Sequence, residues 1–409
     1  RKARIATPAE AQTLCDNETA VLEYIMSDDK SAAYGDASGH SYCLIIRKNS
    51  KTLVPLDGLF DYKKTVADFR TAVIEPNRKR ERERLGALLY GKLISPLEKT
   101  ISGASKIIIV PDGHLAFLPF DALRQNEGAA YLCERYTITL SPSVSVLLMT
   151  RERRFSSRKS DLLAFGGAVY SDGEGQGRGR RSGVKRTVGV NTKDFIRTES
   201  SRQLPYYDTL SLSWENIPGT LDEVKGIGAV LRAGSDASIY TGKDVTESMV
   251  KSLSRSGKLA QYRSVHFACH GYYDADKPAY SAVVLSEVSG SVKTGEDGYL
   301  SVPEVAALNF QCDIVTLSAC ETGLGKIVGG DGVVGLARAF QEAGALRVGV
   351  TLWQVADEPT KRFMIALYRK MGSEKIPFSK AMSEIKKEFI RSKEFNDPYF
   401  WSSFILYGE

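Results

Sequence analysis

The chain has 409 residues, of which 43% are hydrophobic, so it can bury one large core or two ordinary ones. Its 55 Lys and Arg residues against 49 Asp and Glu residues give a net charge of +6, which is too balanced to indicate nucleic-acid binding. No apolar run approaches the roughly 18 residues of a membrane-spanning helix, and no signal peptide opens the chain. We therefore expect a soluble, cytoplasmic protein. Because the chain starts with Arg1 rather than Met, we also expect it to be a piece of a longer protein.

The first part of the chain alternates strands and helices. Runs rich in β-branched and apolar residues predict strands at 41–46, 52–56, 106–110 and 135–140. Helical patterns cover 61–73, 77–97 and the residues after Pro142. The charge run at 78–84 has alternating signs, which is typical of a solvated helix face. We expect residues 1–160 to form a first α/β half.

A long polar segment interrupts the second part. After a strand at 161–169, residues 171–217 are rich in Gly, Arg and Ser, and such a composition cannot bury enough surface to offset its ordering entropy. We read it as a mobile insertion. Its basic cluster, Arg178 to Arg186, could suggest nucleic acid, but no aromatic residues interleave it, so no direct nucleic-acid contact is expected.

The remainder again alternates helices and strands, and residues 161–409 are expected to form a second half. Helices are predicted from Pro218, from Thr246 as N-cap, and at 303–308, 333–342 and 377–391. Another helix is predicted after the turn at 354–358 and ends near Met371. Strands are predicted at 262–269, 282–287, 313–319 and 347–353, and within PYFWSSFILYG at the end of the chain. This alternation predicts a mainly parallel sheet with helices on both faces.

Two chemically reactive side chains fall at strand ends. Cys320 follows the strand at 313–319 and precedes a glycine-rich loop, and His270 follows the strand at 262–269. Open α/β sheets place their ligands at this carboxyl edge. A small residue, Cys, two residues and Gly, with a His about 50 residues upstream, is a caspase-type signature.

These motifs resemble those of a known family. His270-Gly271 and SACETG (318–323) are similar to the catalytic motifs of CHAT proteins, which are caspase-like (clan CD) cysteine peptidases related to separase. IIIVPDGHLAFLPFDAL, ERYTITLSPSVSVL and PYFWSSFILYG are also similar to CHAT segments, so the resemblance covers nearly the whole chain. It implies a caspase-like fold whose first half is catalytically empty. It also implies tetratricopeptide repeats upstream of this fragment.

The chemistry that we infer is acyl transfer. The Cys320 thiolate attacks a peptide carbonyl, while His270 protonates the leaving amine and then activates the hydrolytic water. The resemblance places the oxyanion-hole N–H groups at Gly271 and Cys320. No acidic third member can be named.

Substrates are expected to carry a basic side chain at the residue before the scissile bond. LWQVADEPTKRF resembles the separase segment that lines a pocket for a basic side chain, which implicates Trp353 and Asp357. Asp331 in the glycine loop is a second acidic candidate. The competing interpretation is that Asp357 only caps a helix that begins at Pro359.

Three alternatives stay open. Cys320 and His270 could be ordinary buried residues, since free cysteine is often buried. His266, Cys269, His270, Cys312 and Cys320 could form a zinc site, but alternate residues of a strand point to opposite faces and no second CxxC completes the set. The chain could also be a non-catalytic caspase-like scaffold. We expect a peptidase without metal or cofactor that cleaves protein substrates and is activated by a partner or by upstream repeats.

The cysteine content suits a reducing compartment. The six cysteines show no disulfide-scaffold spacing, and several lie within apolar strand-like runs. They are Cys15, Cys43, Cys133, Cys269, Cys312 and Cys320.

Overall fold

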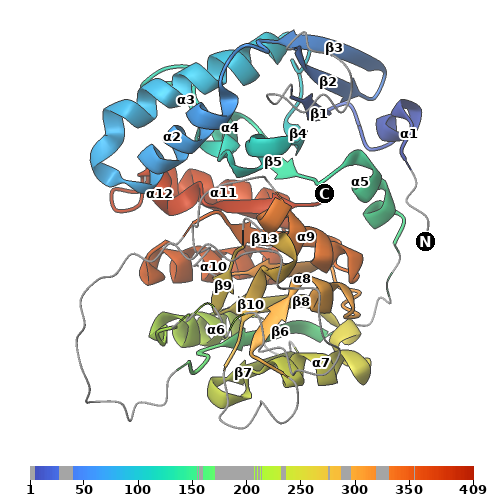
Figure 1. Cartoon of the computed structure of the whole chain (residues 1–409), viewed down its shortest axis with the longest axis vertical. Coiled ribbons are helices and arrows are strands. Elements are labelled where there is room, and N and C mark those ends of the chain that lie inside the picture. Colours follow the sequence, from blue (N-terminus) through green and yellow to red (C-terminus); the bar gives the residue numbers. More distant parts are fainter. Residues whose placement is uncertain are drawn as a thin grey trace, which may run out of the picture.

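A single eleven-stranded sheet runs through both predicted halves of the chain. The structure is a computed structural model that describes residues 5–26, 40–153, 155, 160–170, 207, 210, 212, 214–231, 236–274, 277–286, 296–318, 331–353 and 355–409. The strands follow one another across the sheet in the order β3 (Ser50–Leu56), β2 (Ser41–Arg47), β1 (Thr19–Ile25), β4 (Lys106–Val110), β5 (Thr137–Leu140), β14 (Phe404–Tyr407), β13 (Arg347–Thr351), β12 (Ile314–Leu317), β8 (Tyr262–Ala268), β6 (Ser160–Gly166) and β7 (Ala237–Thr241). Figure 1 shows the sheet along the long axis of the molecule, with the C-terminus between its two parts.

The sheet is mainly parallel, which confirms the predicted fold class. The sheet contains two runs of parallel strands. One run is β1–β4–β5–β14, and the other is β13–β12–β8–β6–β7. Only the β14–β13 pair and the β1–β2–β3 edge are antiparallel. The last strand of the chain therefore joins the two sets of strands. The boundary between the halves near residue 160 stays a prediction, because the sheet is continuous.

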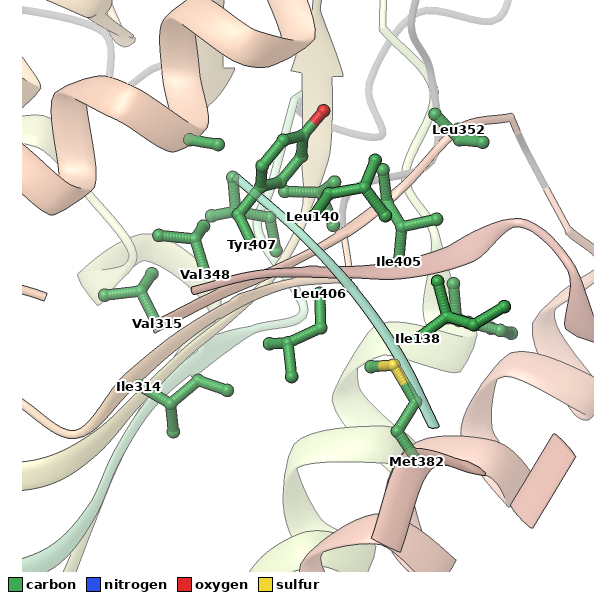
Figure 2. Packing of buried hydrophobic residues seen from close by; sticks show 14 of the residues in the cluster. Ile138, Leu140, Ile314, Val315, Val348, Leu352, Met382, Ile405, Leu406 and Tyr407 are labelled. Atoms are coloured by element: carbon green, nitrogen blue, oxygen red, sulfur yellow. The ribbon is translucent and has the colours of Figure 1, made fainter. Parts of the chain in front are cut away.

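Buried apolar side chains fill the junction at β14. Ile405 and Leu406 of β14 pack with Leu140 of β5, Val348 of β13 and Met382 from a helix (Figure 2). All of these residues are nearly excluded from solvent. Burying such side chains contributes about 1.5–3 kcal/mol each, so the junction is stabilised by packing as well as by the strand ladder.

Helices cover both faces of the sheet, as predicted. They are α1 (Pro8–Gln12), α2 (Tyr62–Ile74), α3 (Lys79–Leu93), α4 (Leu132–Arg135), α5 (Val144–Arg151), α6 (Pro218–Val230), α7 (Glu247–Arg255), α8 (Val302–Ala306), α9 (Asp331–Glu342), α10 (Asp357–Gly372), α11 (Phe378–Arg391) and α12 (Pro398–Trp401). Within β8, Phe267 contacts Phe340 of α9, whereas His266 contacts Tyr368 of α10. Adjacent residues of a strand point to opposite faces, so α9 and α10 lie on opposite sides. Within the described ranges, no helix is both long and apolar enough to span a membrane.

Helix α7 begins where its sequence predicts. The hydroxyl of Thr246 accepts a hydrogen bond from the backbone N–H of Met249, which makes Thr246 the N-cap. This bond satisfies one of the N–H groups that a helix leaves unpaired at its start.

Two polar contacts join the first half of the chain to its last helices, α11 and α12. Arg82 donates two hydrogen bonds to the carboxylate of Asp397, at 3.0 and 2.9 Å, and its side chain is only 5% exposed. The expectation of a fully solvated face at 78–84 is therefore wrong at Arg82. Lys386 of α11 forms a second, deeper pair with Asp121 at 2.8 Å.

A second, three-stranded sheet lies beside the main one. It contains β9 (His270–Tyr272), β10 (Ala282–Val284) and β11 (Tyr299–Ser301), in the order β11–β10–β9. Its strands are antiparallel, and Val284 lies opposite His270. The sheet therefore begins at the predicted catalytic histidine.

Candidate active site

His270 lies at the carboxyl edge of the main sheet, as predicted. Strand β8 ends at Ala268 and β9 starts at His270, and the neighbouring strand β12 ends at Leu317. The two strands are parallel, with Phe267 opposite Leu317. The side chain of His270 is 4% exposed. This edge is where doubly wound sheets bind their ligands.

The backbone sets the tautomer of His270. Its Nε2 atom lies 2.7 Å from the carbonyl oxygen of Glu215. A carbonyl oxygen can only accept a hydrogen bond, so the Nε2 atom carries the proton. In neutral imidazole this leaves Nδ1 with the lone pair, and Nδ1 is the atom that can accept a proton from an acid.

Two aromatic rings hold the imidazole in place. The rings of Trp214 and Tyr170 lie 4.9 and 4.7 Å from it, centroid to centroid. The hydroxyl of Tyr170 accepts a hydrogen bond from the His270 backbone N–H and donates one to the carbonyl of Val284, both at 3.0 Å. Burial raises the pKa of Tyr170, so this hydroxyl stays protonated and can donate. Neither aromatic residue belongs to a motif that can be recognised in the sequence.

Trp214 and Glu215 belong to the end of the predicted mobile insertion. Tyr207 stacks on Tyr299 with ring centroids 3.9 Å apart, and its hydroxyl donates to the carbonyl of Tyr280 at 2.7 Å. The indole N–H of Trp214 donates to the hydroxyl of Tyr299 at 2.8 Å. For these residues, packed contacts against the three-stranded sheet replace the expectation of a mobile loop. Residues 171–206 lie outside the described part of the chain.

Strand β12 precedes the predicted nucleophile in the sequence. Cys320 lies in 319–330, outside the described residues. The last described residue before it, Ser318, donates its N–H to the carbonyl of Phe267 at 2.8 Å. Asp331 is the first residue of α9, and its side chain is not described. Gly271 lies in β9 opposite Val283, and its oxyanion role stays a prediction.

The two predicted specificity residues follow β13. Trp353 is 2% exposed, and its indole N–H donates to the carbonyl of Tyr399 at 3.1 Å. Asp357 is exposed and is the first residue of α10, whose N-cap is Ala356 without a side-chain cap. The interpretation that Asp357 caps a helix beginning at Pro359 is therefore wrong, because the helix starts two residues earlier. A Cβ added at Gly219 of α6 would lie 2.6 Å from Oδ2 of Asp357, so only glycine leaves room for this carboxylate.

His266 of the alternative zinc set has other contacts. His266 uses both ring nitrogens, Nε2 with Glu223 at 2.7 Å and Nδ1 with the hydroxyl of Tyr368 at 3.2 Å. Within the described ranges, the only group of three side chains close enough to share a metal ion is Glu247, Glu296 and Glu304. The ammonium of Lys251 contacts all three carboxylates at 2.5–2.8 Å. A cation of the protein itself therefore already neutralises this cluster.

Comparison with known proteins gives one family and one fold. Residues 83–409 match the CHAT domain. Tetratricopeptide repeat protein 28 from Homo sapiens and from Mus musculus is 24% identical over 355 residues, which is 78% of this chain but 13% of those relatives, so the chain spans a small part of their length. The separase–securin complex of Saccharomyces cerevisiae superposes with a TM-score of 0.52 at 9% identity, covering 97% of this chain and 30% of that one. This likeness shows the fold alone, which is caspase-like.

Proposed function

The chain belongs to the CHAT domain family, and from this premise we propose that it is a site-specific cysteine endopeptidase. In this proposal Cys320 is the nucleophile and His270 is the acid–base residue. The observation that carries the proposal is the hydrogen bond from Nε2 of His270 to the carbonyl of Glu215, because it leaves Nδ1 as a proton acceptor at the carboxyl edge of the sheet.

The position of Ser318 supports the pairing of the two residues. Its N–H bonds to the carbonyl of Phe267, so the chain leaving β12 starts beside the chain leaving β8. Cys320 is two residues further on, and an extended chain spans at most about 7 Å in two residues. We therefore propose that Cys320 and His270 act at the same edge of the sheet.

The reaction proceeds in two halves. The Cys320 thiol gives its proton to Nδ1 of His270, and the thiolate attacks the peptide carbonyl carbon. The C–N bond then breaks as His270 returns the proton to the leaving amine, which leaves a thioester on Cys320. In the second half, water gives a proton to Nδ1 and attacks the thioester carbon. The C–S bond breaks, and the thiol is restored as the carboxylic acid product leaves.

Oxyanion stabilisation is assigned to backbone donors. The proposed N–H groups are those of Gly271 and Cys320. Fixed backbone donors need no reorganisation when the negative charge develops, and removing one such donor typically costs about 10²–10³ in rate. Glycine at 271 supports the assignment, since it has no side chain to obstruct the carbonyl.

Substrates are proposed to carry Arg or Lys before the scissile bond. Asp357 is an exposed carboxylate that follows β13, and β13 is the neighbour of β12, the strand that precedes Cys320 in the sequence. It could pair with a guanidinium or ammonium group. Trp353 would form part of the wall beneath it, and Asp331 is the second acidic candidate.

Regulation by a partner is part of the proposal. The relatives named above are tetratricopeptide repeat proteins, and the solved separase structure contains securin. We infer that upstream repeats or a bound protein activate this domain. We also infer that the enzyme cleaves the 171–206 part of its own insertion, because Tyr207 and Trp214 hold the end of this segment beside His270.

Single substitutions test the proposal. Cys320→Ala and His270→Ala are each expected to abolish cleavage of an Arg-containing peptide under activating conditions, with an unchanged melting temperature for Cys320→Ala. Cys15→Ala, which changes a cysteine at the far N-terminal edge, is the matched control and is expected to keep activity. Cleavage that persists in Cys320→Ala would favour the non-catalytic scaffold for this site.

A further inference from the structure

A cavity of about 720 Å³ opens at the end of the sheet opposite His270. Its lining includes the first residues of β8, β12 and β13 together with the connection between α10 and α11. Because β8, β12 and β13 are parallel, the cavity lies at the starts of these strands, whereas His270 follows the end of β8. The cavity is therefore separate from the proposed active site. Its volume is in the range of small-molecule sites, about 300–1,000 Å³.

The cavity wall contains both apolar and charged side chains. Ile314, Met371 and Phe378 supply apolar surface, whereas Arg263, Arg347 and Lys375 supply positive charge. Two carboxylates, Asp161 and Asp313, also line it. The Asp313 carboxylate is already 3.8 Å from Arg263, at a point where both side chains are exposed.

Arg347 is the least exposed of the three cationic side chains that line the cavity. It begins β13 and is partly buried. Within the described ranges its guanidinium makes no hydrogen bond and no ion pair, although a buried charge is normally paired. Burial lowers the pKa of Arg347, and Asp313 and Glu409 act in the opposite direction. A guanidinium offers five donors in a planar fork that matches carboxylate and phosphate groups.

The start of α11 adds to the positive potential. Pro377 and Phe378, where this helix begins, are part of the lining. No side chain caps the helix, and its first turn contains no acidic residue. The N-terminus of a helix carries about half a positive charge, so it favours an anion nearby.

We propose that this cavity binds a small organic anion, whose carboxylate or phosphate group pairs with Arg347 while its apolar body lies against Ile314, Met371 and Phe378. The proposal does not depend on peptidase activity. Its failure would leave the catalytic proposal unaffected, and the reverse also holds.

Calorimetry with two aromatic anions tests the site. The probes are 1-naphthyl phosphate and 2-naphthoate, with 2-naphthol as the uncharged counterpart and inorganic phosphate as the anion without an apolar body. We expect saturable binding of at least one aromatic anion at one site per chain, and weaker binding of 2-naphthol and of inorganic phosphate. The two aromatic anions distinguish a phosphate ligand from a carboxylate ligand.

Variants of the cationic residues locate the binding. Arg347→Gln should weaken it by about 10- to 100-fold, the usual effect of losing a hydrogen bond to a charged group. Arg338→Gln, which changes an exposed arginine on α9, is the control and should leave binding unchanged. If Arg347→Gln does not fold, Lys375→Gln, which changes an exposed residue of the lining, takes its place and should also weaken binding of the aromatic anion. Absence of saturable binding up to millimolar concentration, or equal binding by wild type and the cavity variant, would overturn the proposal.

Discussion

Replacing Lys386 by Met should destabilise the protein strongly and in a pH-dependent manner. Lys386 and Asp121 are 2% and 4% exposed and lie 2.8 Å apart, where α11 meets the short helical turn Phe120–Ala122. Burial raises the pKa of the Asp121 carboxyl, and the Lys386 ammonium acts against that rise. The Lys386→Met variant leaves the carboxyl buried without its cation. Breaking a buried pair in this way typically costs about 3–5 kcal/mol.

The pKa of Asp121 gives a second, independent value for the loss of unfolding free energy. In the folded variant the buried carboxyl of Asp121 can stay neutral by keeping its proton. In the unfolded chain the same carboxyl has its ordinary pKa of 3.8 and releases the proton at neutral pH. Each unit between that pKa and the solution pH costs about 1.36 kcal/mol, which gives about 4.4 kcal/mol at pH 7 and about 2.3 kcal/mol at pH 5.5. The folded variant binds more protons than its unfolded state, so its stability falls as pH rises. The loss in Lys386→Met should therefore shrink by about 2 kcal/mol at pH 5.5.

Urea unfolding of the full chain at the two pH values measures this effect. Lys380→Met, which changes an exposed lysine of the same helix, is the matched control and should stay within about 0.5 kcal/mol of wild type. The double variant Asp121→Leu, Lys386→Met should recover most of the loss, because an apolar pair can replace a buried ion pair at little cost. The reasoning would be refuted if Lys386→Met lost less than about 1 kcal/mol of unfolding free energy, or if the loss were equal at both pH values. A buried carboxyl without its cation predicts a large loss that depends on pH.

Three further predictions concern the site. Trp214→Ala should lower kcat by about tenfold or more with little change in KM, because the indole packs against the His270 ring and holds it in position, and a steady-state comparison with the control Trp401→Phe checks this. Asp357→Ala should reduce the preference for Arg over Leu before the scissile bond in a positional peptide library; an unchanged basic preference would exclude Asp357 as its cause. Intact-mass spectrometry of the activated wild type should show two associated fragments of roughly 180 and 230 residues from cleavage in the insertion, whereas Cys320→Ala stays whole; one uncut chain in both contradicts self-cleavage.

The fold was predictable where local patterns and tertiary structure agree. The strands around His270 and the helix capped by Thr246 follow from apolar runs and a capping residue, and both are observed. Strand β1 was not identified as a strand, because Thr19–Ile25 follows a mixed polar segment without a clear start signal. The burial of Arg82 was also not predictable, since its partner Asp397 is remote in the sequence. Such pairs depend on tertiary contacts that a local charge pattern does not contain.

The candidate site was predictable only in part. A histidine at the end of a strand can be recognised in the sequence. The hydrogen-bond partner of its Nε2 atom cannot, because it is the backbone carbonyl of Glu215 and every residue has a backbone carbonyl. The composition of 171–217 also obscured its ordered end. The available signal was aromatic and apolar: after the Gly- and Arg-rich part, Tyr207 and Trp214 alternate with leucines, and both aromatic residues pack against the three-stranded sheet.

Covalent labelling tests the central proposal most directly. A peptide ending in Arg and bearing a thiol-reactive acyloxymethyl ketone is incubated with the activated protein, and the labelled residue is identified by mass spectrometry. The proposal predicts one label, on Cys320, that is lost in Cys320→Ala and greatly slowed in His270→Ala, since the imidazole generates the thiolate. Labelling of the other cysteines at the same rate, or equal labelling of Cys320 with and without His270, would contradict the proposed pair.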